Sequence, residues 1–148
     1  MSLPGCCHVE HGCIFAKVVL AREAGCECAR RRSIGEQLAL DCNLPAARGD
    51  CATLAALLHE RARFVLKLPA RGPMTHQQAL RLHCGGVAAL ARHLQPQAEG
   101  AASPPLPDLQ QLVREAQQRH ADLGELPWAS LVPAIAAWQP RRRRPVPR

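Results

Sequence analysis

Aromatic side chains are scarce in this sequence of 148 residues, which has two Phe, two Trp and no Tyr. Strands favour β-branched and aromatic residues, so a core that relies on Leu, Val, Ile and Ala favours helices packed on helices. No alternating stretch of useful strand length is evident either. We therefore expect an all-α fold, a small bundle of five or six helices with a cysteine-rich N-terminal half.

Long apolar runs and signature sequences are also missing. No stretch of about 18 apolar residues occurs, so no membrane-spanning helix is expected. The first residues lack the basic and apolar regions of a signal peptide, which predicts a cytoplasmic chain with reduced thiols. No nucleotide-binding, hydrolase or metalloprotease signature is present, and we expect no enzymatic activity of its own. The Ala-, Leu- and Arg-rich composition is typical of a high-GC bacterial source.

The net charge of +7 arises largely at the C-terminal end. Residues 1–140 carry 14 basic and 12 acidic side chains, while residues 141–148 add five arginines. A nucleic-acid-binding surface is therefore not expected on the folded part. Residues 141–148 are interpreted as a basic tail that either contacts a partner or only keeps the chain soluble.

Apolar periodicity and capping residues predict the helices. Helices are expected over residues 13–24, 34–41, 51–67, 76–94 and 109–123, and over two short pieces within residues 127–140. Pro133 is expected to separate those two pieces. The glycine pair Gly85-Gly86 indicates a kink or the close approach of another backbone. The domain organisation follows: a cysteine-rich helical domain over residues 1–94, a linker over 95–107, and C-terminal helices over 108–140 that pack on or near the first domain.

Helix starts are predicted from four polar residues. Ser33 with Glu36, and Thr75 with Gln78, have the spacing of a capping box. Asp50 and Asp108 are each expected to be the N-cap of the helix that follows.

Cysteine is unusually abundant, with eight residues, seven of them within the first 51. In a reduced compartment such a group indicates metal binding or redox chemistry rather than disulfides. Five of the thiols fall at predicted helix ends or connectors, where a bundle can gather ligands around one point. Thiolates held close together repel one another unless a cation or protons neutralise them. We predict that the metal ligands are Cys13, Cys26, Cys28, Cys42 and Cys51.

The spacing of these residues bears on the kind of metal. Thiolate ligands suit zinc or an iron–sulfur cluster. The sequence has no Cys-x-x-Cys pair of the structural zinc type and no long ferredoxin run. The intervals of 12, one, 13 and eight residues between successive candidates suit a larger centre. We therefore predict an iron–sulfur cluster, with zinc as the alternative.

The remaining cysteines are interpreted differently. Cys84 lies between helix residues of the apolar stripe and is expected to be a core residue. Cys6, Cys7, His8 and His11 could bind a second soft metal, or could belong to a frayed terminus with reactive thiols. Cys7 is kept as a reserve ligand of the main centre.

The sequence predicts a small cysteine-ligated metalloprotein that acts with a protein partner in electron transfer, redox sensing or as an accessory to another enzyme system. Two alternatives stay open. One is a helical interaction or regulatory module without metal, and the other is a zinc-stabilised regulator that binds nucleic acid.

Overall fold

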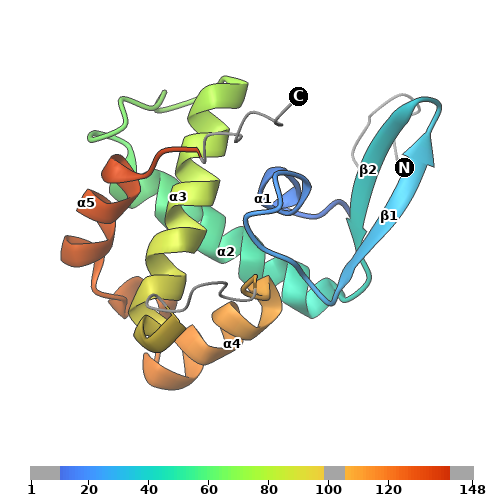
Figure 1. The fold of residues 1–148 in the computed structure, drawn as a ribbon. Coiled ribbons are helices and arrows are strands. Elements are labelled where there is room, and N and C mark those ends of the chain that lie inside the picture. The colour runs from blue at the N-terminus through green and yellow to red at the C-terminus, as the bar shows by residue number, and fades with distance from the viewer. Residues whose placement is uncertain (1–10, 99–105, 141–148) are drawn as a thin grey trace, which may run out of the picture.

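The computed structural model describes residues 11–98 and 106–140, and most of these described residues are helical (Figure 1). Cys6, Cys7, His8 and the basic tail at residues 141–148 lie outside the described residues. The elements, in order, are α1 (Ala16–Leu20), β1 (Ala29–Ile34), β2 (Gln37–Cys42), α2 (Pro45–Ala62), α3 (His76–Leu94), a 3₁₀ turn (Pro96–Ala98), α4 (Leu109–Arg119), a second 3₁₀ turn (Leu123–Glu125) and α5 (Trp128–Ala137).

The two strands correct the expectation of a purely helical fold. β1 and β2 form an antiparallel hairpin in which Ile34 pairs with Gln37, so Gly35 and Glu36 make a two-residue turn. Gly35 has φ +59, a conformation that glycine adopts without steric cost. The predicted helix over residues 34–41 is therefore wrong. Its capping-box spacing coincides with a turn, and the residues behind it pair with β1.

Helix α2 begins earlier than predicted. Pro45 takes its first position, where the fixed φ and the missing N–H of proline are tolerated. Asp50 thus lies inside the helix and is not an N-cap. The helix ends at Ala62 rather than at Lys67, and Lys67 itself has φ +54. Val65, within the predicted helix, is 53% exposed because it follows the observed helix end.

Helix α1 is also shorter than predicted, with five residues instead of the expected span 13–24. Arg22 has φ +59, which ends the helical path before Gly25. Gly25 instead lies beside the start of α4, where its N–H donates to Pro107 O over 2.9 Å and its carbonyl accepts from Leu109 N over 2.8 Å.

Helix α3 agrees with the prediction at both ends. The Thr75 side chain accepts from Gln78 N over 3.1 Å, and the Gln78 side chain accepts from Thr75 N over 3.0 Å. A Cβ added at Gly86 would lie 2.7 Å from two side-chain carbons of Leu58, and one at Gly85 would lie 3.1 Å from Ile135 O. The glycine pair therefore lets α2 and α5 approach α3 closely.

The C-terminal helices follow the prediction in part. Asp108 caps α4, because its carboxylate accepts from Gln111 N over 3.1 Å. α4 ends at Arg119, earlier than expected, and the chain makes a 3₁₀ turn before α5. Pro133 does not split α5, which continues through it. Because Pro133 has no N–H, α5 lacks one backbone hydrogen bond. Trp128, Leu131 and Ile135 nevertheless stay buried on one side of the helix.

The core lies among α2, α3, α4 and α5, and Val18 and Phe15 add the α1 segment to it. Figure 1 shows the hairpin on one side of the helices, with α1 between it and α3. In the part of the chain that the structure describes, no helix combines the length and the hydropathy needed to cross a bilayer.

Candidate metal centre

Five thiols line one small enclosed cavity where the hairpin joins the helices. Cys13 comes from the segment before α1, Cys26 and Cys28 from the connector before β1, Cys42 from the last position of β2, and Cys51 from α2. These are the five residues that the sequence predicts as ligands, and the structure brings all of them to the same place. Whether they bind a metal remains a prediction.

The segment before α1 is held against the base of the hairpin. Cys13 N donates to Leu40 O over 2.9 Å, and Cys42 N donates to His11 O over 2.5 Å. Residue Gly12 forms an antiparallel bridge with Asp41, so this segment continues the sheet locally. Arg48 of α2 adds a side-chain bond from its Nε to Gly12 O over 2.9 Å. These contacts bring Cys13, Cys42 and α2 together.

The connector that carries Cys26 and Cys28 is tied to two other elements. Asn43 N donates to Cys28 O over 2.9 Å, which places the connector beside the end of β2. Glu27 N donates to Asp108 Oδ1 over 2.8 Å. The carboxylate of Asp108 therefore both caps α4 and fixes the residue between the two thiols.

Two local expectations about these cysteines are wrong. Cys42 ends a strand rather than a helix, and Cys13 precedes α1 by three residues. Cys51 lies in the second turn of α2, because the helix begins at Pro45. Cys51 therefore lies inside a helix rather than at the helix end predicted for it, so this expectation also fails.

Burial and crowding raise the pKa of three of these thiols, Cys13, Cys28 and Cys51. The pKa of Cys51 is raised to about 12, mainly by burial and then by the neighbouring Cys26, Cys13 and Cys42 and the carboxylate of Asp50. The pKa values of Cys13 and Cys28 are also raised, mainly by burial and then by nearby thiols. A bound cation would supply the charge that the site needs to hold thiolates.

The space that the thiols enclose is small, about 10 Å³. Among the described residues, no set of three or more His, Cys, Asp or Glu side chains already has an arrangement that would hold a metal ion. Binding of a metal at this cavity would therefore require the cysteine side chains to change rotamer. Cys13, Cys26 and Cys28 stand on irregular segments, where such rotation disturbs no helix or strand.

One residue of this cavity is missing from the sequence-based prediction. Gln110 lies in the first turn of α4, lines the cavity and is only 4% exposed. It is the one buried polar side chain among the described residues, and its Oε1 has no hydrogen-bond partner. No sequence pattern marks it, because a glutamine near the start of a helix usually lies at the protein surface.

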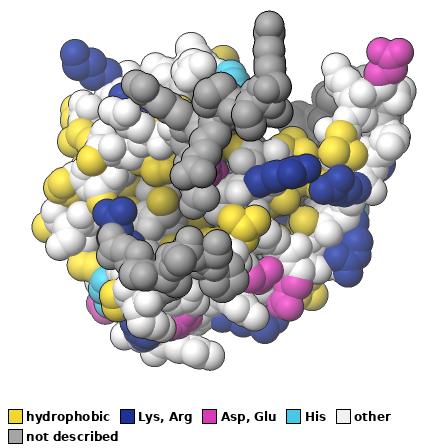
Figure 2. Space-filling view, viewed as in Figure 1, with side chains coloured by type: hydrophobic (Ala, Val, Ile, Leu, Met, Phe, Trp, Pro, Cys, Tyr) yellow, Lys and Arg dark blue, Asp and Glu magenta, His cyan; other side chains and the backbone are white. Residues whose placement is uncertain are grey.

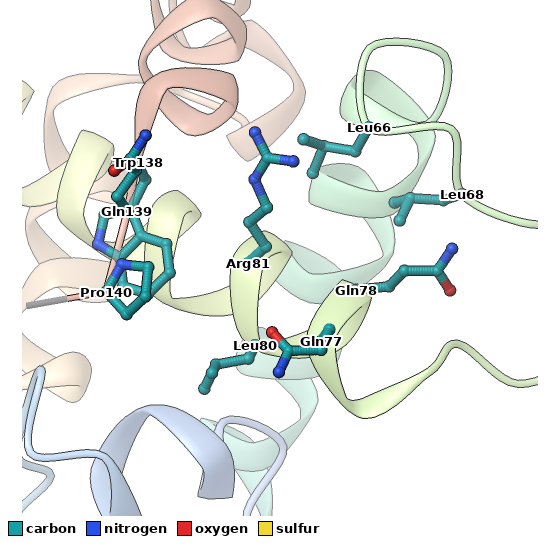
Figure 3. A pocket seen from close by; sticks show the side chains of 9 residues that line it. All are labelled: Leu66, Leu68, Gln77, Gln78, Leu80, Arg81, Trp138, Gln139 and Pro140. Atoms are coloured by element: carbon teal, nitrogen blue, oxygen red, sulfur yellow. The ribbon is translucent and has the colours of Figure 1, made fainter.

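Cys84 lies apart from this cavity and is fully buried in the helical core, as predicted. A second cavity of about 440 Å³ lies between the loop after α2 and the end of α5. Figure 3 shows the Arg81 side chain extending between Leu66 and Trp138 in it. No cysteine lines this second cavity.

The chain matches no family model, no curated protein and no solved structure.

Proposed function

We propose that this protein is a small cysteine-ligated metalloprotein whose centre is held by Cys13, Cys26, Cys28, Cys42 and Cys51. The observation that carries the proposal is the convergence of these thiols, spread over 39 residues of sequence, on one cavity. Ordinary core cysteines have no reason to gather in this way, since each would pack equally well among Leu and Val side chains.

An iron–sulfur cluster is the first candidate for the centre. Every titratable side chain lining the cavity other than Arg48 is a thiol, and soft thiolate ligands select iron–sulfur clusters, zinc or Cu(I). Five thiols exceed the four of a structural zinc site. Three of them lie on irregular segments, so the ligand points can spread to the size of a cluster.

The centre would act in electron transfer, redox sensing or as an accessory to another enzyme system, and each role requires a protein partner. Arg30, Arg31 and Arg32 of β1 are exposed on the hairpin that ends at Cys42. Figure 2 shows Lys and Arg side chains over the hairpin and its junction with the helices. This supports an acidic partner surface next to the centre.

The test is purification without oxygen, followed by visible spectroscopy and by iron, acid-labile sulfide and zinc analysis. We expect a brown protein with iron and sulfide bound, before or after reconstitution with iron and sulfide. A colourless protein with less than one metal per chain after reconstitution would overturn the proposal.

Zinc is the alternative centre on the same thiols. It would give a colourless protein with one zinc per chain and no labile sulfide, and this result would retain the ligands while rejecting the cluster. The Cys84→Ser variant is the matched control in each assay, because Cys84 is a buried thiol outside the cavity.

A further inference from the structure

The cavity lined by the five cysteines, here called the thiol cavity, also contains the side chain of Gln110. The proposed metal ligands give no reason for a polar side chain to be buried there. A buried amide oxygen without a hydrogen-bond partner destabilises the folded state. Gln110 Oε1 is in this state, while the side chain is 4% exposed and lines the space between the five thiols. A group that occupies the cavity is the natural partner for this amide.

The amide can offer either of its two ends to that group. A half-turn about the bond to the amide carbon exchanges the oxygen acceptor for the NH₂ donor. Thiolates and inorganic sulfide are acceptors that carry negative charge, and hydrogen bonds to charged acceptors are stronger than neutral ones. Gln110 would therefore turn its NH₂ group toward a filled centre.

We propose that Gln110 is a positioning residue that donates a hydrogen bond to a sulfur atom of the centre and thereby raises its reduction potential. The inference rests on the proposed function. Hydrogen bonds to the sulfur atoms are one of the factors that set the reduction potential of an iron–sulfur cluster. Reduction adds negative charge, so a donor stabilises the reduced state more than the oxidised state.

The backbone of the site supports this role. Leu109 N donates to Gly25 O over 2.8 Å, and Asp108 Oδ1 accepts from Glu27 N over 2.8 Å. These bonds fix the first turn of α4 against the connector of Cys26 and Cys28. Gln110 is thereby held at a set position relative to two of the thiols.

The experiment compares wild type, Gln110→Met and Gln111→Met, each purified without oxygen and reconstituted with iron and sulfide. Met keeps the length of the side chain and removes the donor. Gln111 is the neighbouring residue on the exposed side of α4, so its variant is the matched control. The readouts are the reduction potential from a redox titration and the melting temperature with and without the centre.

Gln110→Met should shift the potential to a more negative value and should narrow the gap in melting temperature between loaded and metal-free protein. The metal-free variant should melt at or above the wild-type temperature, because an unpartnered buried amide is gone. Gln111→Met should match wild type in both readouts. Equal potentials for Gln110→Met and wild type, both loaded, would overturn this inference while leaving the metal centre intact. A wild-type protein that binds less than one iron or zinc per chain would overturn the proposed function itself.

Discussion

At the scale of single residues, the structure separates two kinds of cysteine. Cys51 lines the thiol cavity, whereas Cys84 is buried among apolar side chains of the core. The pKa of the Cys84 thiol is raised to about 11, mainly by burial. A buried thiol without other thiols around it has a packing role, so the two residues should respond differently to the same substitution.

We predict different effects for Cys51→Ser and Cys84→Ser, the first on metal content and the second on stability. Cys51→Ser should sharply lower bound metal and leave most of the helix content, because Leu54 and Leu58 still pack. Cys84→Ser should keep metal content near wild type and lower the free energy of unfolding by about 1–3 kcal/mol, since a hydroxyl replaces a thiol in an apolar site. Metal analysis and urea unfolding measure the two effects. Equal losses of metal in both variants would show that this division of the cysteines is wrong.

His83 should make the stability depend on pH. Burial, and then the charge of Lys17, lowers its pKa from 6.5 to about 4, and its ring lies edge-on to Phe15 with centroids 5.2 Å apart. Between these pH values the unfolded chain binds a proton that the folded chain does not. The free energy of unfolding is therefore not reduced by His83 above pH 6.5. It decreases as the pH falls from 6.5 toward 4, by up to about 1.4 kcal/mol per pH unit.

Urea unfolding of wild type and His83→Gln from pH 7.5 to 4.0 measures this effect. The wild type should lose about 2–3 kcal/mol more than the variant over this range. Carboxylates contribute to both curves and cancel in the difference. A constant difference across the range would show that His83 titrates normally.

At the scale of elements, the packing of α3 on α2 depends on the absence of a side chain at Gly86. Its added Cβ would lie 2.7 Å from Leu58, which is itself buried. Gly49 offers the matched case, because it lies in α2, is exposed, and has no atom within 4 Å of an added Cβ. Both positions would gain helix propensity from alanine, but only one has room for it.

Gly49→Ala should raise the free energy of unfolding by up to about 1 kcal/mol. Gly86→Ala should lower it, because overpacking costs about 1–3 kcal/mol and exceeds the gain in propensity. Thermal and urea unfolding of both variants provide the comparison. If both substitutions stabilise the protein, Leu58 can move aside and the crossing of α2 and α3 is looser than described.

At the scale of the whole molecule, the thiol cavity lies at the edge of a helical core that packs without it. The core residues of α2, α3, α4 and α5 form one apolar cluster. The hairpin and the segment before α1 complete the cavity on the outer side. The centre should therefore stabilise the fold without being required for the helices to form.

Removal of the metal should accordingly leave the far-UV circular dichroism of helices α2–α5 largely unchanged at 25 °C and lower the melting temperature. A ligand present at 100 times its dissociation constant stabilises the native state by about 2.7 kcal/mol, which for a chain of this size corresponds to roughly 5–10 °C. Dichroism and melting curves with and without chelator measure both quantities. Loss of most helix on chelation would show that metal binding and folding are coupled throughout the molecule.

The sequence by itself determined what depends on local chemistry. The capping box of Thr75 and Gln78, the N-cap at Asp108, the close packing at Gly85 and Gly86 and the core position of Cys84 all follow from residue type and spacing. The five cysteines of the cavity were identifiable in the same way, because reduced thiols at such density and in connectors point to one shared site.

Only the tertiary structure decided the hairpin, the start of α2 and the role of Gln110. Ser33 and Glu36 have a capping-box spacing, yet residues 37–41 pair with β1. Such pairing depends on a partner strand, which a local helix-start pattern does not contain. Pro45 can either stop a helix or begin one, and the packing of α2 against α3 and α4 selects the second. Gln110 is buried because the connector of Cys26 and Cys28 covers the start of α4, through bonds between residues more than 80 positions apart.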